Sequence, residues 1–572
     1  MNSTIVSKNV KRLFKYSKKY KRQIFNIYLL TFFSYLLLVA NPFILRFLID
    51  NVITAERFSL IPSVMAIFLT IIIGQFLIGL ATDYYSNMYQ ISVTKKEQII
   101  LYNKIQKIPF LYSDKTLLGD FLTRIVSDVS EVANFLILTK PSIYLNLLQL
   151  ALILTVLFLF SWHLTIVVLA TIPFYYLILN KFSKNFQQSS SEERKEYSNV
   201  MENLREKIES INTVKILTKE SFFQQKVSER TENWKNSMKK YVRDFLKLDQ
   251  GIYLIISITT PLILGVGGYL MMSNILTIGT LLAFYQFSTW LFVPLKNINE
   301  QLAQLQRADT LSQRFFEILD LPEEESDGIY SFPKNYDIKY NKVSFTYKDE
   351  LVLKDINLYI DKNEKIAIVG TSGSGKSTMM NLLVRLYDPT SGEILLEDKN
   401  LKEYNLQEIR EHIKLVRGND PLFNMSVKEN IMLGDEFSDQ EFNKAVKKAK
   451  VDKFINLLDE GYDTIVGERG SKLSDGQRQR VAIARALIRE PKVLILDEAT
   501  SGVDSQTEEE IFEELKEYDM TLIIISHRLS TIRKADKVVV LKDGEIIGEG
   551  THNELIESSP VYKEIIESQL VV

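Results

Sequence analysis

Residues 370–378 are the part of this sequence whose types and spacing best suit chemistry. They read Gly-Thr-Ser-Gly-Ser-Gly-Lys-Ser-Thr, after the apolar run 365–369 and before the helix-forming Met-Met-Asn-Leu-Leu. A strand, a glycine-rich turn and a helix N-terminus direct backbone N–H groups and the positive end of the helix dipole at one place, which suits a phosphate. The pattern G-x-x-x-x-G-K-[ST] predicts that Lys376 reaches the β- and γ-phosphates of a nucleotide while Ser377 binds Mg²⁺. The predicted phosphate-binding residues are Gly370, Thr371, Ser372, Gly373, Ser374, Gly375, Lys376, Ser377 and Thr378.

Two further stretches place polar side chains directly after buried strands. Asp497 and Glu498 follow the apolar run 493–496, and His527 follows the run 521–525. The carboxyl ends of strands are where α/β sheets place their ligands. We expect Asp497 to lie in the Mg²⁺ shell, directly or through water, and Glu498 to polarise the water that attacks the γ-phosphate. His527 is expected to hydrogen-bond the γ-phosphate or to hold that water in line.

The elements that must position these residues form an α/β domain. Short apolar strands alternate with helical stretches from residue 335 onward, which is the pattern of a parallel sheet with crossover helices. The strands are predicted at residues 365–369, 492–496, 521–525 and 537–541.

The first half of the chain has a different character. Uncharged or nearly uncharged stretches at residues 24–45, 60–82, 141–180 and 250–295 meet or exceed the roughly 20 residues that cross a bilayer. The last two are long enough for two spans each, with breaks at Ser161-Trp162-His163 and near Ser273-Asn274. The fold class predicted is therefore a membrane domain of six transmembrane helices joined to an α/β P-loop NTPase domain.

The distribution of charge predicts how the membrane domain is oriented. Residues 1–22 carry eight Lys and Arg and no acidic residue, and the long connections at about 90–130 and 181–249 are rich in charge. Basic residues near span ends are retained on the cytoplasmic side, so both termini are predicted to be cytoplasmic, and the long connections to be helical extensions. Sparse polar residues inside the spans are candidates to line a pathway for amphipathic or apolar cargo: Gln75, Asn146, Gln149, Gln286, Ser288 and Thr289.

The domain boundaries predicted are a basic N-terminal segment at 1–22, a six-helix transmembrane domain at 23–305, a linker at 306–334 and a nucleotide-binding domain at 335–572. Composition excludes other classes. The net charge of −2 gives no support for a nucleic-acid binder whose affinity rests on a basic surface, and the chain has no cysteine for disulfides or thiolate chemistry. Its four histidines are too scattered along the chain to suggest a metal cluster.

Further motifs carry a resemblance to a known family. Leu473-Ser474-Asp475-Gly476-Gln477 is similar to a signature sequence, with Asp475 in place of its first glycine, and 501–504, ending in Asp504, matches a D-loop. Tyr347 matches the aromatic residue that stacks on adenine, and 466–470, 109–115 and 211–217 resemble segments that couple a membrane domain to an ATPase. In order and over nearly the whole chain, these motifs resemble those of ATP-binding cassette exporter half-transporters.

The resemblance implies a mechanism that needs two nucleotide domains. Ser474, Gly476 and Gln477 of one subunit, with Asp504, would close over ATP and Mg²⁺ held by Lys376 of another, and hydrolysis would let the pair separate. One chain carries both halves of such a site, so a homodimer is favoured over a paired half-transporter. The expected place is the cell membrane, among lipid, and the expected cargo is a lipid, a drug-like amphiphile or a peptide.

Two alternatives stay open beside ATP-driven export: import on the same scaffold, and an ATP-gated channel or regulator. The six spans argue against a soluble or DNA-repair ATPase. The roughly 22 residues before the first span argue against an N-terminal peptidase.

The sequence departs from the family at Gly418, where a glutamine that contacts Mg²⁺ and water usually ends a strand. Asn419 or a water could substitute, or hydrolysis could be slow. We therefore expect a slow basal rate and, if Asn419 has not taken over the role, a faster one in Gly418→Gln.

Overall fold

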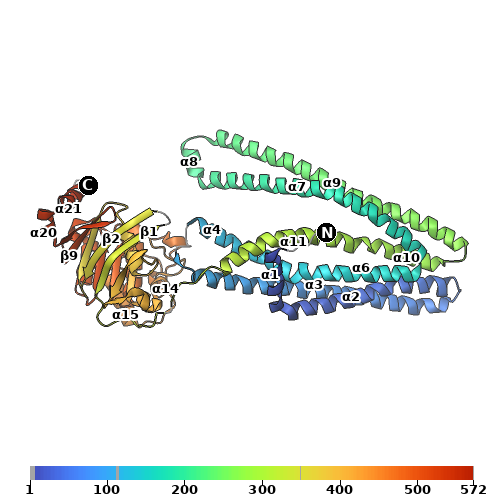
Figure 1. Ribbon diagram of the computed structural model, residues 1–572, viewed down its shortest axis with the longest axis horizontal. Helices are drawn as coiled ribbons and strands as arrows, with labels where there is room; N and C mark the ends of the chain where they lie inside the picture. The colour runs from blue at the N-terminus through green and yellow to red at the C-terminus, as the bar shows by residue number, and fades with distance from the viewer. Residues whose placement is uncertain (1–6, 111–114, 327, 348–349, 571–572) are drawn as a thin grey trace. The chain divides into compact units, whose positions relative to one another are not determined.

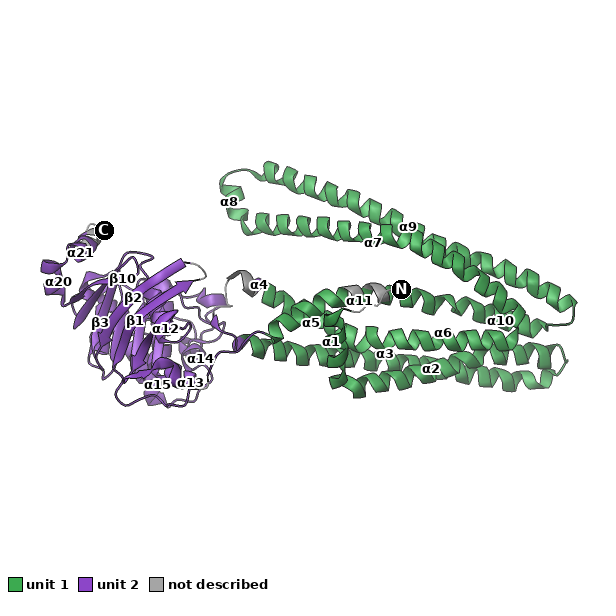
Figure 2. Ribbon diagram, in the orientation of Figure 1, with its two compact units in different colours: residues 1–105, 120–320 green, residues 106–119, 321–572 purple. Residues whose placement is uncertain are grey.

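The computed structural model describes residues 7–110, 115–326, 328–347 and 350–570, which belong to two compact units. Unit 1 comprises Met1–Ile105 and Asp120–Asp320, and unit 2 comprises Gln106–Gly119 and Leu321–Val572. Figure 2 colours the two units separately, and each is described here by itself.

Unit 1 is built from helices. In chain order they are α1 (Lys8–Tyr16), η1 (Ser17–Tyr20), α2 (Lys21–Phe47), η2 (Leu48–Ile53), η3 (Phe58–Leu60), α3 (Ile61–Gln106), α4 (Lys115–Thr123), η5 (Arg124–Asp128), α5 (Val129–Asn134), η6 (Phe135–Thr139), α6 (Lys140–Phe160), α7 (Trp162–Glu209), α8 (Ile211–Ile216), α9 (Glu220–Met272), α10 (Ile278–Trp290) and α11 (Phe292–Leu319). Because α11 continues to Leu319, the first part of the predicted linker is helical.

Six stretches of the described residues are long and apolar enough to cross a membrane, which confirms the predicted number of spans. Several are far longer than a bilayer requires. At 1.5 Å per residue, the 53 residues of α9 extend about 80 Å, against roughly 30 Å of hydrocarbon. The predicted helical extensions are therefore continuous with the membrane helices, and Figure 1 shows α7 and α9 as a long hairpin joined by α8.

The two predicted breaks within the apolar expanses are confirmed. Ser161 has an extended backbone between α6 and α7, and its hydroxyl accepts a hydrogen bond from Leu164 N at 3.3 Å, which caps α7. Thr277 caps α10 in the same way by accepting from Thr280 N at 3.1 Å, after α9 has ended at Met272.

Unit 2 contains two sheets. The strands are β1 (Ile338–Tyr347), β2 (Glu350–Ile360), β3 (Lys365–Gly370), β4 (Ser391–Leu396), β5 (Lys399–Asn400), β6 (Ile413–Arg417), β7 (Val493–Asp497), β8 (Thr521–Ile525), β9 (Lys537–Lys542) and β10 (Glu545–Gly550). A four-stranded sheet has the order β2-β1-β4-β5, and a six-stranded sheet has the order β10-β9-β3-β8-β7-β6. All pairs from β9 to β6 are parallel, as the alternation of strands and helices predicts.

The helices of unit 2 pack on three hydrophobic clusters. They are α12 (Lys376–Leu383), η7 (Leu401–Glu403), α13 (Leu406–His412), α14 (Val427–Met432), α15 (Asp439–Lys448), α16 (Asp452–Ile455), η8 (Gly461–Asp463), η9 (Glu468–Gly470), α17 (Asp475–Leu487), α18 (Ser505–Lys516), α19 (Leu529–Ile532), α20 (His552–Ser558) and α21 (Pro560–Leu570). One cluster lies under α12, between the two sheets, and a second joins α14, α15 and α17 to β7 and β8. The third joins α19, α20 and α21 to β3 and β9. The central strands β3, β7 and β8 are buried throughout, so their carboxyl ends form one rigid edge.

Candidate nucleotide-binding and catalytic site

The glycine-rich turn connects β3 to α12 as the sequence predicts. Gly375 is the residue before the helix and has φ +101°, a conformation open to glycine but strained for other residues. Lys376 is buried, and its Nζ donates hydrogen bonds to the backbone oxygens of Gly370 and Thr371, both at 2.9 Å. An ammonium has three N–H donors, so the lysine holds the loop with two and keeps one for a ligand.

Ser374, inside the same turn, gives an independent sign of a ligand. The residue is 2% exposed, and its hydroxyl has no hydrogen-bond partner among the described residues. Burying an unpaired hydroxyl is costly, so such a group is usually satisfied by something the protein binds. A phosphate oxygen in the turn would be such a partner.

Asp497 ends β7 and is also buried. Burial raises the pKa of its carboxyl above the ordinary value, although a hydrogen bond with Ser377 lowers it. Burial likewise lowers the pKa of Lys376, against the opposing charges of Glu498 and Asp497. A hydroxyl and a carboxylate in hydrogen-bond contact are hard oxygen donors, and Mg²⁺ commonly takes one or two protein ligands with phosphate oxygens and water. Ser377 and Asp497 therefore fit a magnesium ion.

Glu498 and His527 lie at the ends of adjacent strands, since β7 and β8 pair in parallel. His527 Nε2 is 3.4 Å from Glu498 Oε1, and both side chains are about half exposed. Glu498 has φ +54°, and its N–H donates to the backbone oxygen of Ile525 at 3.0 Å. The chain turns sharply after Asp497, so the two consecutive carboxylates lie in different surroundings. Asp497 is buried beside the phosphate loop, whereas Glu498 is open to solvent.

Tyr347, at the end of β1, belongs to an aromatic cluster. Its ring meets Phe345 edge-on at 4.7 Å and Tyr387 at 5.2 Å, and the Phe110 ring lies 5.6 Å from Tyr387. Residues 109 and 110 begin the first predicted coupling segment, and with residues 106–108 before them they pack in unit 2, where Glu324 N donates to Lys107 O at 2.7 Å. Part of the remaining segment, residues 111–114, lies outside the described residues.

The signature residues form the start of α17, which packs in the cluster of α14 and α15 rather than in the cluster beneath α12. Ser474 and Gln477 make a reciprocal capping box, and Asp504 caps α18 through Thr507 N at 2.9 Å. Hydrogen bonds from Thr507 lower the pKa of Asp504, so it stays ionised. Asp475, the departure from the signature, is exposed and pairs with Arg478.

Gln479 is a residue that the sequence reasoning missed. Its side chain is buried and bridges two loops: Nε2 donates to the backbone oxygen of Gly418 and to Ser501 Oγ, both at 3.0 Å, and Oε1 accepts from Gly502 N at 2.8 Å. All of its polar atoms are thereby used. The only sequence signal was its place two residues after Gln477, within a helix that reads as ordinary amphipathic surface.

Arg528, next to His527, is a second residue that was missed. Its guanidinium donates to the backbone oxygen of Val503 at 2.7 Å and pairs with the buried carboxylate of Glu508. Glu508 also accepts from Thr500 at 3.0 Å and Thr531 at 2.9 Å. The loop at 501–504 is thus held from both sides, by Gln479 and by Arg528.

Gly418 is enclosed by the backbone of the catalytic turn. Its N–H donates to Asp497 O at 2.9 Å, and a Cβ built on it would lie 2.5 Å from Glu498 O. Such a distance requires the backbone to shift, so this geometry argues that Gly418→Gln disturbs the catalytic turn, against the expectation that it speeds hydrolysis. Asn419 is exposed, whereas Arg417 donates to Asn381 on α12 at 2.7 Å, so Arg417 links this strand end to the phosphate-binding helix.

The polar residues within the spans differ in what they contact. Asn146 accepts from Asn297 at 3.1 Å, and Gln75 accepts from Asn41 at 3.4 Å, so these two join neighbouring helices. The hydroxyls of Ser288 and Thr289 donate within their own helix, to Tyr285 O and Gln286 O. Gln286 Oε1 is buried without a partner among the described residues. Gln75 Nε2 is unpartnered in the same way, so Gln286 and Gln75 are the members of the set best suited to meet a ligand or a second subunit.

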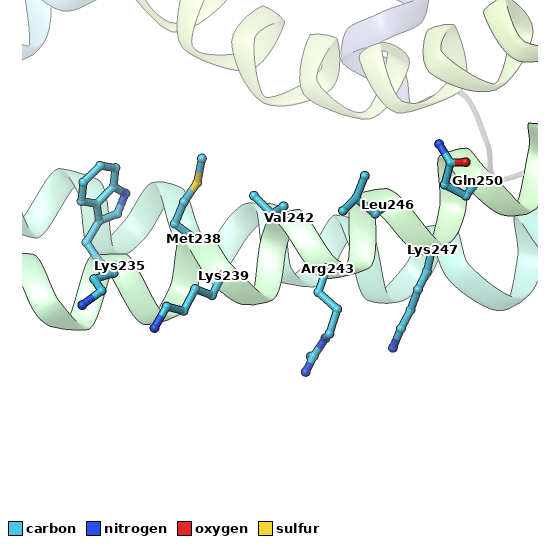
Figure 3. A pocket seen from close by; sticks show the side chains of 9 residues that line it. Lys235, Met238, Lys239, Val242, Arg243, Leu246, Lys247 and Gln250 are labelled. Atoms are coloured by element: carbon cyan, nitrogen blue, oxygen red, sulfur yellow. The ribbon is translucent and has the colours of Figure 1, made fainter.

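A shallow hollow of about 840 Å³ lies along the extension of α9. Figure 3 shows two rows of side chains on this helix: Met238, Val242 and Leu246 on one side, and Lys239, Arg243 and Lys247 on the other. The apolar row repeats every four residues and is 37–47% exposed. A row of this kind amid polar surface marks an interface with another body.

Comparisons with known proteins agree with this geometry. Residues 24–295 match the ABC transporter transmembrane region, and residues 353–501 match the ABC transporter family. The chain is 33% identical to a protein of Staphylococcus aureus strain NCTC 8325 / PS 47 that is named as a multidrug export ATP-binding/permease protein. The match covers 98% of this chain and 100% of the relative, and the protein of strain COL matches equally. A solved bacterial Atm1-family ABC exporter with ATP bound has the same fold, with a TM-score of 0.82, 24% identity, and coverage of 96% of this chain and 98% of that one.

Proposed function

Since this chain belongs to the ABC transporter family and joins the transmembrane region to the ATPase in one polypeptide, we propose that it is an ATP-driven exporter half-transporter. The observation that carries the proposal is the convergence of Lys376, Asp497, Glu498 and His527 at one edge of the sheet, in a chain whose described residues include six helices long and apolar enough to cross a membrane. An ATPase site and a membrane domain in one chain imply that hydrolysis drives movement across the membrane.

The residues divide the work of hydrolysis. The free N–H of Lys376 and the Ser374 hydroxyl bind phosphate oxygens, and Tyr347 offers a partly exposed ring for adenine. Magnesium held by Ser377 and Asp497 would supply positive charge for the phosphate oxygens. Glu498 takes a proton from water aimed at the γ-phosphorus, and His527 holds that water and the phosphate in line. The water oxygen then bonds the γ-phosphorus as the bond from this phosphorus to the β,γ-bridging oxygen breaks, with inversion at phosphorus, and ADP leaves with the bridging oxygen.

The working form we propose is a dimer, with the homodimer preferred because one chain carries both the phosphate loop and the signature. Two surfaces of unit 1 support it. One is the apolar row of α9 at Met238, Val242 and Leu246. The other is the tip of the α7–α9 hairpin, where Ile216 is 81% exposed and Ile208 is 68% exposed. Apolar side chains this exposed in a solvent-facing tip are suited to a partner, and the second coupling segment, 211–217, lies there.

The cargo class we propose is amphipathic or apolar, because the described spans contain few polar side chains, and among these Asn41, Gln75 and Gln286 have a buried polar atom without a partner. A lipid, a drug-like amphiphile and a peptide all satisfy this description. We place the protein in the cell membrane with both termini and unit 2 on the cytoplasmic side, since the basic segment at residues 8–22 precedes the first span.

The test is transport in sealed proteoliposomes, with ATP supplied outside to molecules whose ATPase faces outward. Export predicts accumulation of a fluorescent amphiphile inside, abolished by Glu498→Gln. Import would instead empty preloaded vesicles. A gated channel would pass the dye down its gradient with Glu498→Gln as well as with the native chain, and either outcome would replace the exporter proposal.

A further inference from the structure

The segment before the first membrane helix has two faces of different chemistry. Lys8, Lys11, Lys15 and Lys18 follow one another at spacings of three, four and three residues, which aligns them along one side of α1 and η1. All four are exposed, as are Lys21 and Arg22 at the start of α2. Residues 8–22 contain no acidic side chain, so this face is a continuous strip of positive charge. We call these four lysines the lysine face.

The opposite face of α1 is fixed to unit 1. Val10 and Leu13 are buried, and the Phe14 ring packs edge-on against Phe135 of η6 at 5.9 Å. Arg12 lies beside Lys8 and Lys15 rather than on this buried face; it donates to the Asp320 carboxylate at 2.7 Å and lies 3.9 Å from the centre of the Phe316 ring, both at the end of α11. α1 thus contacts several helices, and in Figure 1 it is the short dark-blue helix that runs across the long ones. A helix that crosses membrane-spanning helices lies along the membrane plane.

The acidic groups near α1 are occupied by other donors. The buried carboxylate of Glu97, on α3, accepts from Tyr16 at 2.7 Å and from Lys19 at 2.9 Å, and it also bonds Tyr20. Asp320 pairs with Arg12, and Asp309 bonds Ser7. In the described part of the chain, no ion pair joins a member of the lysine face to a carboxylate. The protein therefore fixes the helix while leaving four like charges in a row without counter-charge.

The position along the chain indicates which anion would supply that counter-charge. The exposed apolar side chains of α2 begin at Phe25, which is 62% exposed and marks where hydrocarbon contact starts. α2 begins at Lys21, only four residues or about 6 Å of helix before Phe25, so the lysine face that directly precedes α2 lies beside the start of hydrocarbon contact, toward which a lysine side chain can extend. Headgroups occupy this depth, and basic segments beside a membrane helix are attracted to anionic lipids.

We propose that the lysine face is a docking surface for anionic phospholipid headgroups of the leaflet next to α1. The lipid phosphates accept from the four ammonium groups, while Tyr16 and Lys19 attach the segment to Glu97 and Arg12 attaches it to Asp320 at the end of α11. Lipid binding does not require transport or hydrolysis, so this inference and the exporter proposal can fail separately.

The experiment compares the full-length chain in nanodiscs of pure phosphatidylcholine with nanodiscs containing one third phosphatidylglycerol. Amide hydrogen exchange over residues 7–20 is expected to slow at least threefold with phosphatidylglycerol in the native chain, and not in K8Q/K11Q/K15Q/K18Q. Titration of short-chain phosphatidylglycerol into the detergent-solubilised chain should show roughly tenfold or greater weakening in that variant, since each lysine near an anionic surface contributes.

The matched control is K339Q/K447Q/K516Q/K542Q, which removes the same charge from four exposed lysines of unit 2. It should behave as the native chain in both measurements. Equal slowing in the α1 variant, or equal slowing by inorganic phosphate in phosphatidylcholine nanodiscs, would overturn the proposal. So would full protection of residues 7–20 in pure phosphatidylcholine, because a second copy of the chain would then be covering the lysine face.

Discussion

His527 Nε2 lies 3.4 Å from Glu498 Oε1, across the boundary between two strands that pair in parallel. The two side chains come from points 29 residues apart in the sequence and meet only because β7 and β8 are neighbours. The Glu498 carboxylate can therefore act as a general base, and the His527 imidazole beside it can orient both the carboxylate and a water molecule. Hydrolysis should depend on both.

Glu498→Gln is expected to keep ATP binding and to lower turnover at least a hundredfold, because an amide has the carboxylate's shape but cannot accept the proton. The measurements are phosphate release and equilibrium ATP binding on the same preparation. His527→Ala should reduce turnover less, since it removes an orienting group. Near-native turnover in Glu498→Gln would assign the base elsewhere.

Lys376→Ala is expected to weaken nucleotide binding by roughly 1.5–3 kcal/mol, or more than tenfold, by removing a charge-assisted contact to phosphate. The lysine also donates to Gly370 O and Thr371 O, so loop order should fall as well. Isothermal titration with ATP measures the affinity, and the melting temperature without nucleotide reports the loop. Unchanged affinity would contradict the phosphate-loop assignment.

Asp497→Asn is expected to change the melting temperature and the magnesium-dependent hydrolysis in opposite directions, so it distinguishes the two roles of this side chain. The pKa of the Asp497 carboxyl is raised by burial, so its protonated form is favoured in the folded state and its ionised form costs stability at neutral pH. The cost is absent below the unfolded pKa and grows as pH rises through the folded pKa. Asp497→Asn should therefore melt higher than the native chain near pH 8, with the difference shrinking toward pH 4.

The same variant should lose magnesium-dependent hydrolysis, because an amide is a weaker ligand than a carboxylate for a hard cation. Differential scanning fluorimetry without nucleotide gives the first result, and phosphate release at several magnesium concentrations gives the second. A lower melting temperature at pH 8 would mean that the charge of Lys376 outweighs burial.

Gly418→Ala and Gly418→Gln are both expected to lower turnover, because any Cβ at this position must displace the Glu498 backbone oxygen 2.5 Å away. The matched control is Asn419→Ala, one residue on and exposed, which should be nearly silent. Turnover is measured at saturating magnesium and ATP. A higher turnover in Gly418→Gln would instead mean that the absence of the glutamine side chain limits the rate of hydrolysis in the native chain.

Gln479→Met keeps the size of the side chain but removes all three hydrogen bonds to Gly418, Ser501 and Gly502. We expect a lower kcat with little change in KM for ATP, because the glutamine positions loops and touches no nucleotide. Gln479→Glu, which retains the acceptor for Gly502 N, should recover part of the rate. A fall in affinity with kcat preserved would contradict the positioning role.

Features that depend on neighbours in sequence could be predicted before the structure. Hydropathy and length gave the six spans, and the breaks at Ser161 and Ser273 follow from polar residues that interrupt apolar runs. The strand at 521–525 and the turn before Lys376 are local patterns too. The structure adds the order in which the strands pair, which brings the site residues together.

The remaining features depend on which backbones approach one another. From the sequence, Gly418 is interpreted as the loss of a glutamine. In the structure the Glu498 backbone oxygen lies so close to Gly418 that a side chain there would clash with it. Gln479 and Arg528 hold the 501–504 loop from helices and strand ends distant in sequence, and neither has a spacing that indicates its partner. Long-range hydrogen bonds of this kind are set by sheet order, which a single sequence does not encode in any short motif.

The length of the α7–α9 hairpin has a mechanical consequence. Helices that run unbroken from the apolar region to the exposed tip at α8 form a lever, so a tilt of a few degrees at one end becomes a displacement of about one helical turn, some 5 Å, at the other. Pro173 and Pro261 each remove a backbone hydrogen bond within the apolar part of their helix. The lever can therefore bend where lipid surrounds it and stay stiff toward the tip, so a tilt of only a few degrees inside the membrane accompanies a displacement of several ångströms at the tip.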